Sequence, residues 1–268
     1  MGLSRHGDQY GSKCKMDTVA ARAQQEKFWN NKAKNFPRYE AGEDNYESRM
    51  LNIALSHGVV FKDADILDVG CGSGMYTIRL AKEAKHVTAA DISSEMLSIL
   101  KDDAAAQGIN NIVTYLGDWL EFKSDRKFDV VFCSMTPAVQ SEEGRLKVLE
   151  HAKGWVVYMG FAGRMESCML SGLYQHYGII PKKFNDAPAM REWLQNRRAE
   201  YTAYPVEGEW VVPRTYEEAA SNCRDMLSIY GVTPEEDLLE KYIRPHLDES
   251  GKYIERTAYS IEMIIWRV

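Results

Sequence analysis

A glycine-rich turn that directly follows a short apolar run places the strongest constraint on the fold. The turn lies in I-L-D-V-G-C-G-S-G-M-Y, residues 66–76. The apolar run Ile66–Val69 predicts a buried strand, and the stretch Met75–Ala84 has helical spacing. Glycines let a backbone turn sharply and approach a ligand closely, and a helix start offers free N–H groups and the positive end of a dipole. The segment therefore predicts a strand–turn–helix unit that binds a ligand at the turn.

The alternation of apolar runs and helical stretches continues to residue 161. Further strands are expected at residues 86–90, 112–116, 128–133 and 155–161, with helices at 94–107 and 141–151. Continuous apolar strands separated by helices are typical of a parallel sheet that is covered on both faces. We therefore expect an α/β core over residues 61–163.

The segments on either side of this core have different patterns. Residues 1–16 are polar and are expected to lack regular structure, whereas residues 17–60 predict N-terminal helices that cover the ligand site. After residue 163 the alternation stops. Helices are expected there at 165–177, 187–199, 216–230 and 234–246, and one strand at 201–212. We interpret residues 164–256 as a helical cap and residues 257–268 as the closing strand of the core sheet.

Composition argues against several classes of protein. The 268 residues carry a formal net charge of -6, so a basic face for nucleic acid is not expected. No apolar run reaches the roughly 20 residues of a membrane span, and the N-terminus lacks a signal-peptide pattern. The five cysteines include no C-x-x-C pair, which predicts neither a disulfide framework nor a cysteine metal site. These observations predict a cytoplasmic protein with no metal, no membrane partner and no nucleic-acid partner.

The spacing of the glycines distinguishes this turn from a dinucleotide-binding turn. The dinucleotide pattern is G-x-G-x-x-G, whereas this sequence has G-x-G-x-G, with Met75 at the place of the third glycine. Asp68 precedes the turn, where a carboxylate is poorly placed for a pyrophosphate. It suits a cationic group, such as the ammonium of an amino acid. The pattern therefore argues against an oxidoreductase that uses a nicotinamide cofactor.

A second acidic residue stands at the end of the second predicted strand. Asp91 follows Gly70 by 21 positions, which suits a carboxylate that accepts hydrogen bonds from both hydroxyls of a ribose. Ile92 and Met96 come next, and their side chains are expected to pack against an adenine ring.

A third acidic residue stands at the end of the third predicted strand, in Gly117-Asp118-Trp119. A carboxylate there can accept from the amino group of an adenine, while the indole forms an apolar wall. Two structural alternatives stay open: Asp118 caps the turn that follows, and Trp119 packs in the core.

Read in chain order, D-V-G-C-G-S-G, A-D-I-S and G-D-W resemble the motifs of class I S-adenosylmethionine-dependent methyltransferases over residues 64–161. The N-terminal F-W-N-N-K-A-K-N-F resembles the entry helix of small-molecule members, including ubiquinone and menaquinone-type enzymes. The resemblance implies a doubly wound, mostly parallel, seven-stranded Rossmann-like sheet with an antiparallel last strand. It also implies contacts to S-adenosylmethionine: Asp68, Gly70, Gly72 and Gly74 to the methionine part, Asp91 to the ribose, Asp118 and Trp119 to the adenine.

The residues that could act on a methyl acceptor are less well defined. Enzymes that methylate the amino group of adenine carry an N-P-P-Y-type tetrad at the end of the fourth strand, where this sequence has S-M-T-P, residues 134–137. We expect Ser134 and Thr136 to border the methyl-transfer site, where Ser134 would contact the cofactor, with local capping bonds as the alternative. His176, Tyr177 and Tyr39 are the candidates for a catalytic group. Solvent-facing or packing roles are their alternatives.

These features predict an enzyme that transfers a methyl group from S-adenosylmethionine to a small molecule held under a helical cap. The acceptor, the oligomeric state and any metal requirement stay open at this level. Two other functions also remain. One is a non-catalytic protein that binds S-adenosylmethionine or S-adenosylhomocysteine, and the other is an RNA methyltransferase, which predicts a basic strip beside the cofactor site.

Overall fold

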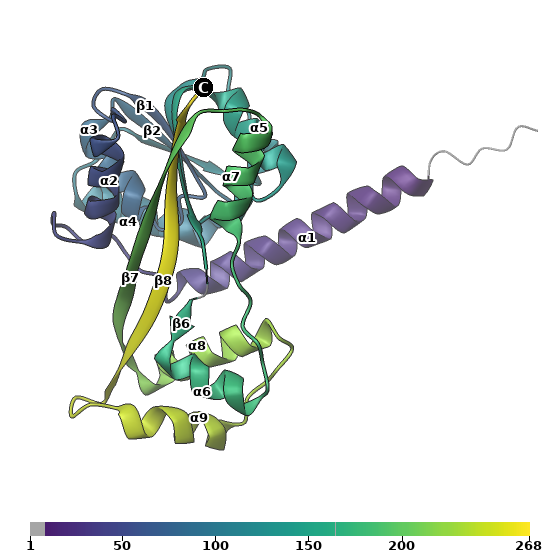
Figure 1. Ribbon diagram of the computed structural model, residues 1–268, viewed down its shortest axis with the longest axis vertical. Helices are drawn as coiled ribbons and strands as arrows, with labels where there is room; N and C mark the ends of the chain where they lie inside the picture. Colours follow the sequence, from purple (N-terminus) through teal and green to yellow (C-terminus); the bar gives the residue numbers. More distant parts are fainter. Residues whose placement is uncertain (1–8, 164) are drawn as a thin grey trace, which may run out of the picture. The chain divides into compact units, whose positions relative to one another are not determined.

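The computed structural model describes residues 9–163 and 165–268, so expectations for residues 1–8 lie outside the described residues. The chain divides into two compact units, whose elements are drawn in Figure 1. Unit 1 comprises Met1–Tyr158 and Ile265–Val268, and unit 2 comprises Met159–Ile264. Each unit is described by itself below.

The strands form one mixed sheet in the order β3-β2-β1-β4-β5-β8-β6, and β7 pairs with β8. Their bounds are β1 (Asp65–Val69), β2 (His86–Asp91), β3 (Ile112–Leu116), β4 (Phe128–Ser134), β5 (Ala152–Phe161), β6 (Glu166–Ser167), β7 (Tyr201–Thr215) and β8 (Lys252–Arg267). The pairs β1–β2, β1–β4 and β2–β3 are parallel, whereas β8 runs antiparallel. The predicted fold class is confirmed. The sheet has eight strands and not seven, because the two-residue β6 has no apolar run that a pattern could reveal.

The order of the strands in unit 1 opens a crevice beside β1. The chain steps outward from β1 to β2 and β3, then returns to β4 on the other side of β1. The register pairs Asp68 of β1 with Ala89 of β2 and with Phe132 of β4, so these strands end at one edge. Ligands of open parallel sheets bind at such a switch point, outside the carboxyl ends of the strands.

The helices of unit 1 are α1 (Gln9–Ala33), α2 (Tyr46–Ser56), α3 (Met75–Glu83), α4 (Ser94–Ala106) and α5 (Glu142–His151). Ser93 caps α4, since its Oγ accepts the N–H of Met96 at 3.1 Å. Helix α1 contacts α4 and begins at Gln9, whereas the sequence pattern predicted helix only from residue 17.

Unit 2 contains more strand than the sequence pattern indicates. It holds β6, β7 and most of β8, with the helices α6 (Cys168–His176), α7 (Asp186–Asn196), α8 (Tyr216–Ser228) and α9 (Glu236–Ile243). Strand β8 begins at Lys252, five residues before the predicted start at residue 257. The reason is that Glu255 occupies a buried position in this strand and breaks the apolar pattern. The helices bury Leu173, Leu227 and other apolar side chains in a common core.

Candidate active site

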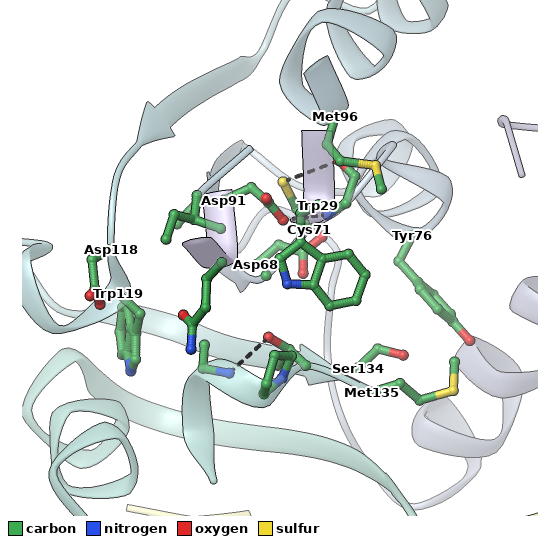
Figure 2. Close-up of a pocket in the computed structure, with 18 of the residues that line it drawn as sticks. Trp29, Asp68, Cys71, Tyr76, Asp91, Met96, Asp118, Trp119, Ser134 and Met135 are labelled. Atoms are coloured by element: carbon green, nitrogen blue, oxygen red, sulfur yellow. Dashed lines mark hydrogen bonds between the residues drawn. The ribbon is translucent and has the colours of Figure 1, made fainter. Parts of the chain in front are cut away.

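A cavity of about 190 Å³ lies in unit 1 at the carboxyl ends of β1, β2 and β4 and beside the turn after β3 (Figure 2). Nearly all the residues predicted to bind the cofactor line it: Asp68, Gly70, Gly72, Asp91, Ile92, Met96, Gly117, Asp118, Trp119 and Ser134. Gly74 is absent from the lining. The three acidic strand ends therefore share one cavity, as the parallel topology requires.

The three glycines of the turn have left-handed backbones, but they serve different contacts. A Cβ on Gly70 would lie 2.1 Å from Oγ1 of Thr136, so Gly70 permits the loop after β4 to approach the turn. A Cβ on Gly74 would lie 2.2 Å from Cδ1 of Leu100, so Gly74 permits α3 to pack on α4. In this structure Gly74 acts in packing, whereas Gly72 faces the cavity.

Asp68 is a buried carboxylate at the end of β1. Its side chain is 2% exposed, and Oγ1 of Thr77 donates a hydrogen bond of 2.6 Å to its Oδ2. Burial raises the pKa of Asp68 to about 7, against the lowering effect of Thr77, and the nearby Asp91 raises it further. None of the groups that shift this pKa is a cation. The site therefore favours a ligand that brings a positive charge to Asp68.

Asp91 is oriented by two backbone N–H groups at the end of β2. Its Oδ2 accepts from Gly72 at 2.9 Å, and its Oδ1 accepts from Ser93 at 2.8 Å. Burial raises the pKa of Asp91, and these N–H groups oppose the rise. Each carboxylate oxygen keeps a second lone pair. A carboxylate held in this way is suited to accept hydrogen bonds from a pair of hydroxyls.

Asp118 and Trp119 line the cavity and also make the local contacts that were the structural alternatives. Asp118 accepts the N–H of Leu120 at 2.8 Å through Oδ1 and forms an ion pair with Arg22 at 2.8 Å through Oδ2. Trp119 is 5% exposed, and its Nε1 donates to the carbonyl of Gly144 at 3.0 Å. Asp118 therefore caps the following turn and Trp119 packs in the core, and both residues also line the cavity.

The N-terminal segment supplies lining residues that the sequence motifs did not identify. Gln25 and Trp29 of α1 and Phe36 line the cavity, and Figure 2 shows the Trp29 indole across it. Oγ of Ser73 donates to the carbonyl of Pro37 at 2.6 Å, which attaches this segment to the glycine turn. The sequence predicted that residues 17–60 cover the ligand site, but it did not identify which of their side chains face the cavity.

The three candidates for a catalytic group lie outside the cavity lining. Tyr39 accepts a hydrogen bond from Nζ of Lys82 at 2.7 Å, and the guanidinium of Arg79 stacks on its ring at 4.7 Å. His176 is exposed and meets the ring of Tyr177 edge-on, and both belong to unit 2. Among the described residues, no group of three or more metal-ligating side chains is found. No helix within the described ranges is long and apolar enough to cross a membrane.

Comparison with known proteins agrees with this geometry. Residues 66–159 match the family model of a methyltransferase domain. The ubiquinone biosynthesis O-methyltransferase of Serratia proteamaculans is 33% identical over 86 residues, which cover 31% of this chain and 35% of that protein. The enzyme of the same name from Coxiella burnetii is 32% identical over 81 residues, which cover 30% and 34%. The chain thus spans about a third of the length of these relatives.

Two solved structures share the fold. Magnesium protoporphyrin IX methyltransferase from Synechocystis PCC 6803, with bound SAH, aligns with a TM-score of 0.52 at 14% identity and covers 90% of this chain and 98% of that chain. The YcgJ protein of Bacillus subtilis aligns with a TM-score of 0.51 at 14% identity and covers 82% and 97%. Fold, motifs and family match define an α/β methyltransferase domain. The match over residues 66–159 and the shared fold support a domain of the class I S-adenosylmethionine-dependent methyltransferase type.

Proposed function

We propose that this protein binds S-adenosylmethionine in the cavity of unit 1 and transfers its methyl group to a small-molecule acceptor. The single observation that supports this most strongly is Asp68, a buried carboxylate with no cationic neighbour acting on its pKa. The ammonium of the cofactor's methionine part would supply the missing charge. Asp91 would then accept from the ribose hydroxyls, and Asp118 with Trp119 would contact the adenine.

The side chains of the cavity fit such a ligand along its length. Figure 2 shows Asp118 and Trp119 at one end and Tyr76 and Met135 at the other, with Asp68 between them. The order is therefore the predicted adenine contacts, then Asp68, then the end of the same cavity that Tyr76 and Met135 line. Bound there, the cofactor supplies a sulfonium methyl group.

The main contributions of the protein to methyl transfer would be to position the two reactants and to exclude water from them. In an in-line displacement, the bond from sulfur to the methyl carbon would break as the bond from the acceptor atom to that carbon formed; sulfur would keep the electron pair, and an acceptor hydroxyl would release its proton to water. The described part of the cavity offers no histidine or lysine as a base. Its apolar side chains, such as Met75, Met96 and Trp29, would exclude water from the reacting atoms.

A small acceptor fits the charge and the relatives. The formal net charge of -6 opposes binding to a nucleic-acid backbone. The charged side chains in the described cavity wall are all acidic, namely Asp68, Asp91 and Asp118. The relatives named O-methyltransferases support a hydroxyl as the accepting group.

Isothermal titration with S-adenosylhomocysteine tests the proposal. We expect binding to the wild-type chain, and an affinity about 10–100-fold lower for Asp91→Asn, because a hydrogen bond to a charged group is worth about 1.5–3 kcal/mol. Asp102→Asn on the exposed face of α4 is the matched control and should bind like the wild type. The absence of binding to the wild type at high micromolar ligand would refute the function. Binding without release of S-adenosylhomocysteine from S-adenosylmethionine on any acceptor would indicate a non-catalytic binding protein.

A further inference from the structure

Two hydroxyl groups in the cavity wall are buried and have no hydrogen-bond partner of acceptable geometry among the described residues. They are Oη of Tyr76 and Oγ of Ser134. The Tyr76 side chain is 7% exposed. Figure 2 shows both residues, with Met135, on the side of the cavity away from Asp118 and Trp119. Buried polar groups are nearly always hydrogen-bonded, so a pair left open in a cavity wall points to a ligand.

The fold holds both residues firmly in this place. Tyr76 lies in the first turn of α3, and its ring packs on Phe132 of β4 with ring centres 5.0 Å apart. Ser134 ends β4, and the next residue, Met135, has a left-handed backbone with φ of 48°. Thr136 then closes against Gly70. The two hydroxyls therefore come from a strand end and a helix start, which are rigid supports.

The two hydroxyls at this end of the cavity are themselves neutral groups. Burial raises the pKa of Tyr76 well above its ordinary value, and the neighbouring Tyr46 and Glu47 raise it further. The hydroxyl of Ser134 lies close enough to lower that pKa in part. Tyr76 is therefore a neutral phenol at physiological pH, which both donates and accepts hydrogen bonds. In Figure 2, Met135 is labelled next to these two residues, and no charged side chain is labelled beside them.

We propose that Tyr76 and Ser134 form the acceptor subsite, which takes a neutral, apolar molecule through a hydroxyl group that hydrogen-bonds to both of their hydroxyls. The inference rests on the proposed function, since it assigns the opposite end of the same cavity to the cofactor, and it reassigns Ser134 from the predicted cofactor contacts to the acceptor. The acceptor hydroxyl donates to one side chain and accepts from the other. Met75 and Met135 provide the apolar contacts around the body of the acceptor.

The test uses three small probes on the protein loaded with S-adenosylhomocysteine. Catechol is a neutral probe with hydroxyl groups, 1,2-dimethoxybenzene lacks the donors, and benzylamine carries a positive charge. Titration followed by ligand-observed NMR should show the tightest binding for catechol. Tyr76→Phe and Ser134→Ala should each lower the affinity for catechol by about 3–10-fold, as expected for the loss of one neutral hydrogen bond. The affinity for 1,2-dimethoxybenzene should change little. Tyr204→Phe and Ser124→Ala are matched controls outside the cavity lining.

The outcomes separate this inference from the proposed function. Affinity for S-adenosylhomocysteine, measured first, should stay within twofold of the wild type in both variants. If the wild type does not bind S-adenosylhomocysteine, the proposed function fails. If it binds but either variant loses more than tenfold in that affinity, the hydroxyl contacts the cofactor and the acceptor subsite is refuted. Three results with catechol would also refute the acceptor subsite. Catechol could fail to bind, it could bind no more tightly than the other two probes, or its affinity could be the same for both variants and the wild type.

Discussion

Two buried carboxylates, one in each unit of the chain, differ in the partners that the protein gives them. Glu255 in unit 2 is 4% exposed and contacts Oγ of Ser167 at 3.1 Å, Nδ2 of Asn222 at 3.1 Å and the guanidinium of Arg214. Asp68 in unit 1 is 2% exposed and receives one side-chain hydrogen bond, from Thr77. Glu255 therefore has a cationic partner, Arg214, whereas no cation is among the groups that shift the pKa of Asp68.

This difference distinguishes a buried carboxylate with a structural role from one that binds a ligand. A buried charge is tolerated when hydrogen bonds and a counter-charge satisfy it inside the fold. Glu255 meets this condition and ties β8 to α8 and to the end of β7. Asp68 does not meet it, and it faces a cavity. Removal of Glu255 should therefore cost stability, whereas removal of the charge on Asp68 should cost binding.

The largest effect is expected from Glu255→Ala. The substitution leaves the partly buried Arg214 without its carboxylate, and breaking such a pair lowers the free energy of unfolding by about 3 kcal/mol. Urea unfolding followed by circular dichroism measures the loss. Glu209→Ala is the matched control, because Glu209 pairs with Arg256 in an exposed ion pair worth about 0.5 kcal/mol. Equal losses in both variants would contradict a structural role for burial at Glu255.

The second-largest effect is expected from Asp68→Asn, on the affinity of the protein for S-adenosylhomocysteine. Loss of the negative charge should weaken S-adenosylhomocysteine by about 10–100-fold, since the contact to an ammonium is charge-assisted. The free energy of unfolding without ligand should not fall, because the asparagine carries no buried charge. Titration calorimetry and urea unfolding on the same preparation give both values. Reduced stability with unchanged affinity would place Asp68 with Glu255 as a structural group.

The pH dependence of stability sharpens the same contrast. The pKa of Asp68 is about 7 in the folded chain against an ordinary value of 3.8, so the folded state holds this proton more tightly. The contribution to stability is then full below about pH 4 and is lost as pH rises to about 7. The unfolding free energy of the wild type, relative to Asp68→Asn, should therefore fall over this range by about 1–3 kcal/mol. A constant difference between the two proteins from pH 4 to 7.5 would contradict the raised pKa.

The sequence predicted unit 1 more accurately than unit 2 for a physical reason. Strands β1 to β4 are continuous apolar runs between helices, and their predicted bounds agree with the structure within one residue. In unit 2, the start of β8 was missed because Glu255 is buried through partners distant in sequence, which no local pattern can show. The structure also places Gly74 in helix packing, which depends on Leu100 in another helix.

The candidate site was predictable where each strand end carries its own polar residue. Asp68, Asp91 and Asp118 all reach one cavity, as parallel strands predict. Tyr76 and Trp29 were not identified, because an aromatic residue at a helix start or on a helix face has the same sequence signal whether it faces a cavity or a core. Only the packing of α1 and α3 separates these outcomes.

The smallest effect is expected at the rim of the cavity, where Arg22 pairs with Asp118. The two side chains are 34% and 19% exposed, so their attraction is weak and screened by salt, unlike the buried contacts of Asp68. Arg22→Ala should weaken S-adenosylhomocysteine by about two- to threefold at 50 mM NaCl, because Asp118 loses an orienting partner, and the difference should vanish at 500 mM. Titration calorimetry at both salt concentrations measures this, with Arg126→Ala in the loop before β4 as the control. Tighter binding by Arg22→Ala would instead mean that Arg22 competes with the adenine for the carboxylate of Asp118. The ion pair would then close the empty cavity, and cofactor binding would have to break it.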